Sequence, residues 1–312
     1  MPLVIFIILA VALLFIVLGA YVFFTACKRK KDLPWLDEEA IRKTHYKKYA
    51  RMIQESHQWL MEHGAKDLWI ESEDGLKLHA LWVSAPNAVG TILLAHGYRS
   101  TPLVDFGPAF AGYYARGLNL LIPTQRSHGR SEGKYITFGV KESGDMLRWV
   151  SYHNLHFGKQ PFILSGLSMG ASTVMYMLDE ALPKNIKAAI VDCGFTSPRQ
   201  IIGSVFRSVA HMPDNIFLWP CEWFARVFAG FSLKGKDSRK TLARNKLPIL
   251  MVHGKADGFV PCYMTEQGYE TCTGDKRILL VEGADHGVSY LLEPEKYNHL
   301  INELFTQVGL IK

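Results

Sequence analysis

The stretch from Pro161 to Ser172 constrains the fold of this chain most, because an apolar run there ends in a Gly-x-Ser-x-Gly motif. Small residues and good helix formers follow at once. This order predicts a strand, a tight turn at Ser168 and a helix. Gly166 and Gly170 flank the serine because a Cβ at either position would collide with the turn or the neighbouring backbone. The turn lifts the Ser168 hydroxyl above the sheet edge, which makes it the candidate nucleophile.

A second Gly-x-Ser-x-Gly match, Gly129 to Gly133, is centred on Ser131. Polar residues 125–128 precede it, and residues 134–137 follow without starting a helix-forming run. The motif forms an elbow only between a strand and a helix. The sequence therefore predicts that Ser131 is a loop residue.

Apolar runs of strand length alternate with helix-forming stretches through residues 67–312. Residues 68–83 contain Glu73-Asp74-Gly75, a turn signal between two strand-like halves, and predict a hairpin. Strands that alternate with helices indicate an α/β fold with a mainly parallel, doubly wound sheet covered on both faces. Besides the strand before Ser168, strands are expected at 91–95, 118–123, 187–192, 247–253 and 277–281, and helices at 110–116, 141–156 and 294–307.

Residues 196–245 interrupt this alternation and are rich in large apolar side chains. An insertion after the strand that ends at Asp192 would cover the carboxyl ends of the strands, where ligands bind in open α/β sheets. We expect a helical lid whose apolar underside contacts substrate. A helical layer with a small core of its own is the alternative, and the two interpretations can coexist. The candidate substrate contacts in the lid are Phe217, Trp219, Trp223 and Phe224.

The run from Leu3 to Phe24 contains no charged residue. As a helix it would be about 33 Å long, at about 1.5 Å per residue, which is enough to span the hydrocarbon core of a bilayer. Basic residues 28–31 follow it directly, and no Lys or Arg precedes it. The positive-inside rule therefore predicts a single-pass transmembrane anchor, residues 1–27, with the rest of the chain in the cytoplasm.

Two other interpretations of this N-terminus are a cleaved signal peptide and a bacterial lipoprotein leader processed at Cys27. A signal peptide carries its basic residues before a shorter apolar region. In this chain the apolar run is long and the basic residues come after it. That order favours a retained anchor over both alternatives.

Residues 28–66 form a basic connector, expected to be helical from about Glu38 to His63, with Asp37 as N-cap and Gly64 as the stop. One face of this helix would be apolar. The helix could lie on anionic lipid headgroups beside the anchor. We favour the alternative, in which its apolar face docks on the folded domain. The apolar positions are Ile41, Tyr49, Ile53 and Leu60.

Charge and cysteine content narrow the classes of function. The formal net charge is +6, and residues 28–31 carry four of these charges, which leaves +2 for the rest of the chain, so the part that follows the connector is near neutral. This distribution does not support nucleic-acid binding. The five cysteines are odd in number and lack the spacing of metal ligands, which fits a reducing compartment and gives no sign of a metal.

A serine nucleophile needs a base, and the base needs an orienting acid. Asp257 follows the apolar run 247–253, and His286 follows the run 277–281. The chain order Ser168, Asp257, His286 is the one associated with this type of elbow. Asp192, which ends an earlier strand, is the rival acid, and the chain order favours Asp257 over it.

These motifs together resemble the serine hydrolases of the α/β-hydrolase superfamily, near the monoacylglycerol-lipase-like, esterase and serine-aminopeptidase branches. The resemblance covers roughly residues 67–310 and includes His96-Gly97, the elbow, His253-Gly254 with Asp257, and Asp285-His286-Gly287. It implies that His286 is the base and Asp257 its partner. The backbone N–H groups of Tyr98 and Met169 would form the oxyanion hole, with no metal and no other cofactor.

The expected function is that of a membrane-anchored serine hydrolase that cleaves carboxylic esters, with a small-molecule or lipid ester as substrate. The aromatic lid and the anchor favour lipophilic acyl groups. A peptidase or amidase with the same three residues is one alternative, since the same chemistry cleaves amides. A non-catalytic membrane-bound binding protein is a second, since a fold does not fix a function.

Overall fold

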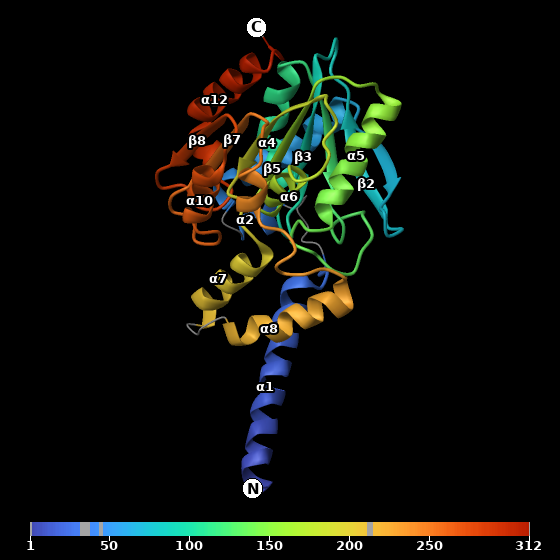
Figure 1. Cartoon of the computed structure of the whole chain (residues 1–312). Helices are drawn as coiled ribbons and strands as arrows, with labels where there is room; N and C mark the ends of the chain where they lie inside the picture. Colours follow the sequence, from blue (N-terminus) through green and yellow to red (C-terminus); the bar gives the residue numbers. More distant parts are fainter. Residues whose placement is uncertain (1, 32–37, 44–45, 211–214, 312) are drawn as a thin grey trace.

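The computed structural model describes residues 2–31, 38–43, 46–210 and 215–311. An α/β body contains the C-terminus, and helix α1 (Pro2–Cys27) projects from it with the N-terminus at the far end (Figure 1). Helices α7 and α8 lie between the body and the projecting part of α1 (Figure 1). The chain is thus an α/β layer structure with a helical extension on one side.

The described residues form one eight-stranded sheet in the order β1-β2-β4-β3-β5-β6-β7-β8. The neighbouring pairs from β4 to β8 are all parallel, whereas β2 pairs antiparallel with both β1 and β4. The predicted mainly parallel sheet is therefore confirmed, with the hairpin at one edge. The strands are β1 (Lys66–Glu71), β2 (Lys77–Val83), β3 (Gly90–Ala95), β4 (Leu118–Thr124), β5 (Phe162–Leu167), β6 (Ile186–Asp192), β7 (Ile249–Gly254) and β8 (Lys276–Val281).

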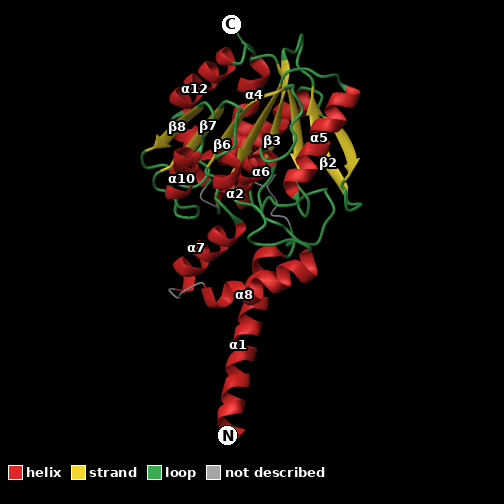
Figure 2. Ribbon diagram, in the orientation of Figure 1, coloured by secondary structure: helices red, strands yellow, loops and turns green. Residues whose placement is uncertain are grey.

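Helices cover both faces of the sheet (Figure 2). Side chains alternate along a strand, so Ile92 and Leu94 pack in one core cluster while Leu93 and Ala95 pack in the other. This burial on both faces explains why the central strands are continuous apolar runs. The first cluster includes α3 (Ala50–Glu62), α4 (Pro102–Ala115) and α12 (Pro294–Gln307), and the second includes α5 (Glu142–His156), α6 (Met169–Met177) and α9 (Ser238–Leu242).

Most of the predicted elements are present within a few residues of their expected bounds. The helix predicted at 110–116 is the main exception, because α4 begins at Pro102. Thr101 caps it by accepting a hydrogen bond from the Val104 N–H, and Pro102 occupies the first turn, where no N–H is needed. Pro108 lies inside the helix and masks its first half in the sequence pattern.

The connector is helical, but not as the single helix expected from Glu38 to His63. It forms α2 (Glu38–Arg42), the 3₁₀ turn η1 (Lys47–Tyr49) and then α3. Ile41 and Tyr46 are both buried in the same cluster as α3. In one continuous helix they would point about 140° apart, so the break lets both face the core. The predicted cap Asp37 lies outside the described residues.

The apolar face of the connector packs on the body, as the favoured interpretation expected. Ile53 and Leu60 of α3 are each 1% exposed and lie in the cluster that contains α4. Trp59, also on α3, stands edge-on to Tyr114 at a centroid distance of 5.3 Å. The connector therefore extends the core of the α/β body.

The insertion between β6 and β7 contains α7 (Pro198–Ala210), α8 (Asn215–Phe224), the π-helical segment η2 (Ala225–Ala229) and α9. A third core cluster joins α8 and η2 to the last turns of α1 and to the elbow, and it includes Phe23, Met169 and Cys221. α1 crosses α8 closely, since a Cβ added to Gly19 would lie 2.4 Å from the Pro220 Cβ. The C-terminal part of α1 is thus packed against the insertion.

Toward its N-terminus α1 is largely uncovered, although Phe15 still contacts Phe217 of α8, with ring centroids 6.1 Å apart. Large apolar side chains along it are strongly exposed, from Leu3 (69%) to Val17 (54%). The helix is long and apolar enough to span a membrane. Within the described residues no other helix meets those criteria.

Candidate active site

The predicted elbow is present at the end of β5. Ser168 has φ 56° and ψ −118°, a backbone conformation that L-residues rarely adopt, and α6 begins at the next residue. The flanking glycines are required by space, because a Cβ on Gly166 would lie 2.2 Å from the Gly170 carbonyl oxygen. One on Gly170 would lie 1.8 Å from the Ala95 carbonyl oxygen. The turn that carries Ser168 is therefore packed closely on itself and against the end of β3.

The structure brings Ser168, His286 and Asp257 into one hydrogen-bonded chain. His286 Nε2 lies 2.9 Å from Ser168 Oγ, and His286 Nδ1 lies 2.7 Å from Asp257 Oδ2. With the proton on Nδ1 donated to the carboxylate, the Nε2 lone pair is left to accept the serine proton. Residues that are far apart in sequence meet here because each follows the carboxyl end of a parallel strand.

The surroundings of Asp257 keep its carboxylate ionised and fixed. Its Oδ1 accepts hydrogen bonds of 2.8 Å from the Phe259 and Val260 N–H groups, and His253 Nε2 lies 3.2 Å from Oδ2. Burial acts to raise the pKa of Asp257, but the hydrogen bonds and charges of His253 and His286 outweigh it and hold the pKa well below its usual range. The carboxylate can therefore stabilise a protonated His286.

Asp192 and Asp285 lie close by but make other contacts. The Asp192 carboxylate is buried near the Ser289 hydroxyl, at 3.4 Å, and burial raises its pKa to about 6. Asp285 Oδ1 accepts hydrogen bonds from the backbone N–H of His286 at 2.7 Å and of Gly258 at 3.2 Å. The His286 ring is thus hydrogen-bonded to Asp257, in line with the preference given by chain order.

The loop after β3 lies directly against Ser168. A Cβ on Gly97 would lie 3.2 Å from the Ser168 Cβ, and the Gly97 N–H donates a hydrogen bond of 2.6 Å to Asp105. The next residue, Tyr98, lines the cavity beside Ser168. Met169 is the first residue of α6, where the helix leaves the N–H without an intrahelical acceptor. Both residues predicted for the oxyanion hole therefore flank Ser168, and their role remains a prediction.

This loop is also bonded to the end of α1, which the sequence did not reveal. The Tyr98 hydroxyl donates to the Ala26 carbonyl at 2.7 Å. The Arg99 guanidinium donates to the carbonyls of Thr25 at 2.6 Å and Lys28 at 3.2 Å, and so caps the C-terminus of the helix. Arg99 has a φ of 52°, and its N–H donates to His128 Nε2 at 3.0 Å. In the sequence, Arg99 appears only as a basic residue shortly after His96-Gly97, and no local pattern indicates that it bonds to the end of α1.

A cavity of about 420 Å³ opens beside Ser168 and His286. Apolar groups supply most of its wall, including Leu167 and Phe259, and the charged residues Arg99, Asp105 and Asp285 also line it. The four residues predicted to contact substrate from the lid do not line it. Phe217 is buried against Phe15 and Phe206, Phe224 stacks near Phe23, and Trp219 and Trp223 are exposed.

Ser131 is buried in a loop, as its sequence context predicted. Its hydroxyl donates to the Thr124 carbonyl at 2.5 Å and accepts a hydrogen bond from the His79 N–H at 2.9 Å. These contacts give the second Gly-x-Ser-x-Gly match a structural role, in holding its loop against the hairpin.

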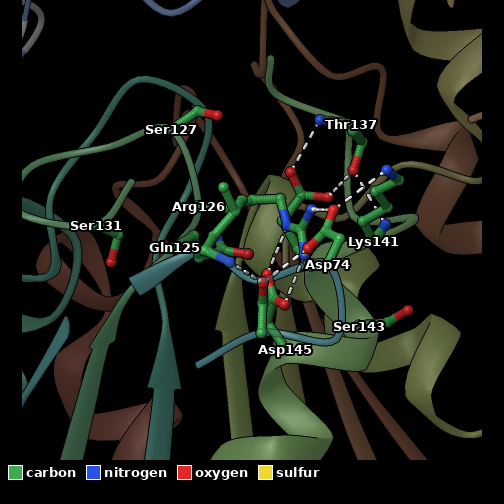
Figure 3. A network of polar contacts seen from close by, with 12 residues as sticks. Asp74, Gln125, Arg126, Ser127, Ser131, Thr137, Lys141, Ser143 and Asp145 are labelled. Carbon is green, nitrogen blue, oxygen red and sulfur yellow. Dashed lines mark hydrogen bonds and ion pairs between the residues drawn. The ribbon is translucent and has the colours of Figure 1, made fainter. Parts of the chain in front are cut away.

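The same loop is fixed by a buried ion-pair network around Arg126 (Figure 3). The guanidinium makes two hydrogen bonds to Asp145, of 2.6 and 2.7 Å, and two to Asp74, of 2.9 and 3.0 Å. Its side chain is only 5% exposed. The network joins the hairpin turn to α5 behind the loop that carries His128, which in turn contacts Arg99.

Cys193 brings a third metal-binding atom type to the site, since its Sγ and ligand atoms of Asp257 and His286 all lie within 4.8 Å of one another. A metal would bind the thiolate, and burial raises the pKa of this thiol well above its usual value. Asp257 and His286 are also hydrogen-bonded to each other. The donor set therefore fits a proton-transfer chain better than a metal site.

No protein-family model matches the chain. Two curated relatives are both described as uncharacterized proteins. YqkD of Bacillus subtilis is 25% identical over 241 residues, 77% of this chain and 79% of YqkD. YfhR of Escherichia coli is 23% identical over 232 residues, 71% of this chain and 73% of YfhR.

Solved structures of several hydrolases have the same architecture. The Pyrococcus furiosus esterase Pf2001 superposes with a TM-score of 0.65 at 23% identity, over 79% of this chain and 92% of its own. Est1E of Butyrivibrio proteoclasticus, solved with ferulic acid bound, gives 0.59 at 17% identity, over 77% of this chain and 99% of its own. The α/β hydrolase GrgF from Penicillium also gives 0.59, at 15% identity, over 78% and 99%. With its mainly parallel sheet, its elbow and these neighbours, the chain has the α/β-hydrolase fold.

Proposed function

We propose that this protein is a membrane-anchored serine hydrolase that cleaves carboxylic esters. The observation that carries the proposal is the hydrogen-bonded chain from Ser168 Oγ through His286 to Asp257, with steps of 2.9 and 2.7 Å. Such an arrangement activates a serine hydroxyl, which is otherwise a weak nucleophile.

The proposed reaction proceeds through an acyl-enzyme. Ser168 Oγ attacks the ester carbonyl carbon while its proton passes to His286 Nε2, and Asp257 stabilises the imidazolium. The carbonyl oxygen becomes an oxyanion held by the N–H groups of Tyr98 and Met169. Collapse breaks the C–O bond of the ester, and His286 returns the proton to the departing alkoxide. Water then repeats the sequence and releases the carboxylic acid.

The substrate is proposed to be lipophilic and the anchor to be retained. The largely apolar wall of the cavity supports the first point. The second is supported by packing, because Phe23 and Cys27 at the end of α1 are fully buried in the third core cluster. Residues 28–31, directly after α1, favour a cytoplasmic location for the catalytic domain.

The direct test is labelling of the full-length membrane protein with a fluorophosphonate probe, followed by hydrolysis of p-nitrophenyl esters of increasing chain length. Ser168→Ala and His286→Ala should abolish labelling, whereas the matched variant Ser131→Ala should keep it. Absence of labelling in the wild-type protein, or equal labelling of all four proteins, would refute the assignment of the nucleophile.

A further inference from the structure

We propose that α8 and η2 carry a membrane-docking face that inserts into the bilayer spanned by α1. The docking face consists of Trp219, Trp223, Val227 and Phe228. It would place the mouth of the cavity at the lipid surface, so that the substrate is an ester drawn from the bilayer. The inference rests on the retained anchor of the proposed function.

The docking face is an exposed apolar stripe. Trp219 is 77% exposed, Trp223 56%, Val227 57% and Phe228 47%. The first three recur at four-residue spacing, which places them on one side of the helix. The opposite side of the same segment, including Cys221 and Ala225, is fully buried in the third core cluster. Aromatic residues of this kind are enriched where a protein meets the interface of a membrane.

The position of α8 along α1 sets its depth in a membrane. The two helices cross at Gly19, 16 residues after the apolar run begins at Leu3. That length of helix rises about 24 Å, whereas the hydrocarbon core is about 30 Å thick. If α1 spans the hydrocarbon core of the bilayer, α8 lies about 6 Å inside the edge of that hydrocarbon layer. Amphipathic helices bury their apolar face to a similar depth at a membrane interface. α8 runs across α1 beneath the body, as such a position requires (Figure 1).

Basic side chains lie on the body side of the docking face. Residues 28–31 follow α1 directly. A cavity of about 540 Å³ beside α7 is lined by Arg199, Arg207, Lys234 and further basic residues, with Asp237 as the acidic group among its lining residues. Cations beside α7 and directly after α1 complement the anionic headgroups of a bilayer, and this favours lipid over a second copy of the chain as the occupant.

The cavity beside Ser168 is linked to the end of α1. Arg99 lines this cavity and also donates hydrogen bonds to carbonyls at the last turn of α1. An ester that leaves the acyl region beside the last turn of α1 would therefore start next to a residue of the cavity wall, Arg99. This arrangement gives the exposed tryptophans a function even though they do not line the cavity.

The test is quenching of tryptophan fluorescence in the full-length protein reconstituted into phosphatidylcholine–phosphatidylglycerol vesicles. Lipids brominated on the acyl chain near the headgroup quench tryptophans that insert there. We expect strong quenching in the wild type and in the matched variant Trp59→Phe/Trp69→Phe, whose replaced tryptophans lie on α3 and β1. Most of the quenching should be lost in Trp219→Phe/Trp223→Phe.

Equal quenching in all three proteins, or none, would overturn the docking face. Absence of quenching together with dimers that dissociate in Trp219→Phe/Trp223→Phe would assign the face to a second copy of the chain. Fluorophosphonate labelling of the same samples separates this inference from the proposed function. Loss of quenching in the Trp219→Phe/Trp223→Phe variant with an unlabelled wild type would support the docking face and refute the serine hydrolase.

Discussion

Gly170→Ala tests whether the elbow and the loop after β3 act as one unit. The new Cβ would lie 1.8 Å from the Ala95 carbonyl oxygen and 2.8 Å from the His96 carbonyl oxygen. Both are backbone atoms, so no side chain can turn aside to make room. Contacts of Cβ atoms essentially never fall below 3.0 Å, so β3 and α6 must separate by more than about 1 Å. Residue 95 lies two positions before Gly97, which contacts Ser168.

A displacement of about 1 Å in an active site costs about 100-fold in rate, or about 2.7 kcal/mol in the barrier. We therefore expect Gly170→Ala to lose at least that factor in kcat/KM on a p-nitrophenyl ester. The matched control is Gly144→Ala on α5, where nothing lies within 4 Å of the added Cβ. Thermal unfolding of both variants would separate loss of folding from loss of activity. A folded Gly170→Ala protein with wild-type kcat/KM would refute the reasoning.

Three further predictions concern buried charges. Asp257→Asn should lower kcat by about 10³–10⁴-fold, because the amide favours the wrong tautomer of His286. Asp192→Asn should keep most of the activity. The reverse result would identify Asp192 as the acid. Burial raises the pKa of Asp192 to about 6, so between about pH 3.8 and 6 the native state holds a proton that the unfolded chain has lost, and the free energy of unfolding falls as the pH rises. Asp192→Asn should reduce this pH-dependent decrease in the free energy of unfolding by up to about 3 kcal/mol, measured by chemical denaturation at several pH values. If the free energy of unfolding changed with pH as it does in the wild type, the raised pKa of Asp192 would be contradicted. Arg126→Met leaves Asp145 buried without its partner and should destabilise the protein by about 3–5 kcal/mol in thermal unfolding, with recovery in Arg126→Met/Asp145→Leu.

The sequence predicted the elements whose signals are local. The elbow was readable because its strand, glycines and helix are adjacent, and the parallel strands because each is a continuous apolar run. Asp257 and His286 could be selected because parallel strands deliver their carboxyl ends to one edge of the sheet. For the same reason the Ser168–His286 contact, which joins residues 118 positions apart, required no information beyond the topology.

Other features depend on partners that no local pattern identifies. The connector looked like one helix, and it breaks because Ile41 and Tyr46 share a core with α3. The aromatic residues of the insertion indicated an apolar surface that packs against another part of the molecule or against substrate. They did not reveal that α1 would cover Phe217 while Trp219 stayed exposed. The Tyr98–Ala26 hydrogen bond spans 72 positions and joins an apolar helix to a loop from another part of the fold.

The cap that Tyr98 and Arg99 place on α1 bears on how an active preparation can be made. A chain shortened to begin after Cys27 would lose the Thr25 and Ala26 carbonyls that accept from these side chains. It would also lose Phe23 from the cluster that contains Met169. Proteolytic removal of residues 1–27 would therefore disturb the loop that lies next to Ser168. Recombinant expression should therefore keep the first helix, because its last turns pack in the same core cluster as Met169 and are hydrogen-bonded to the loop after β3.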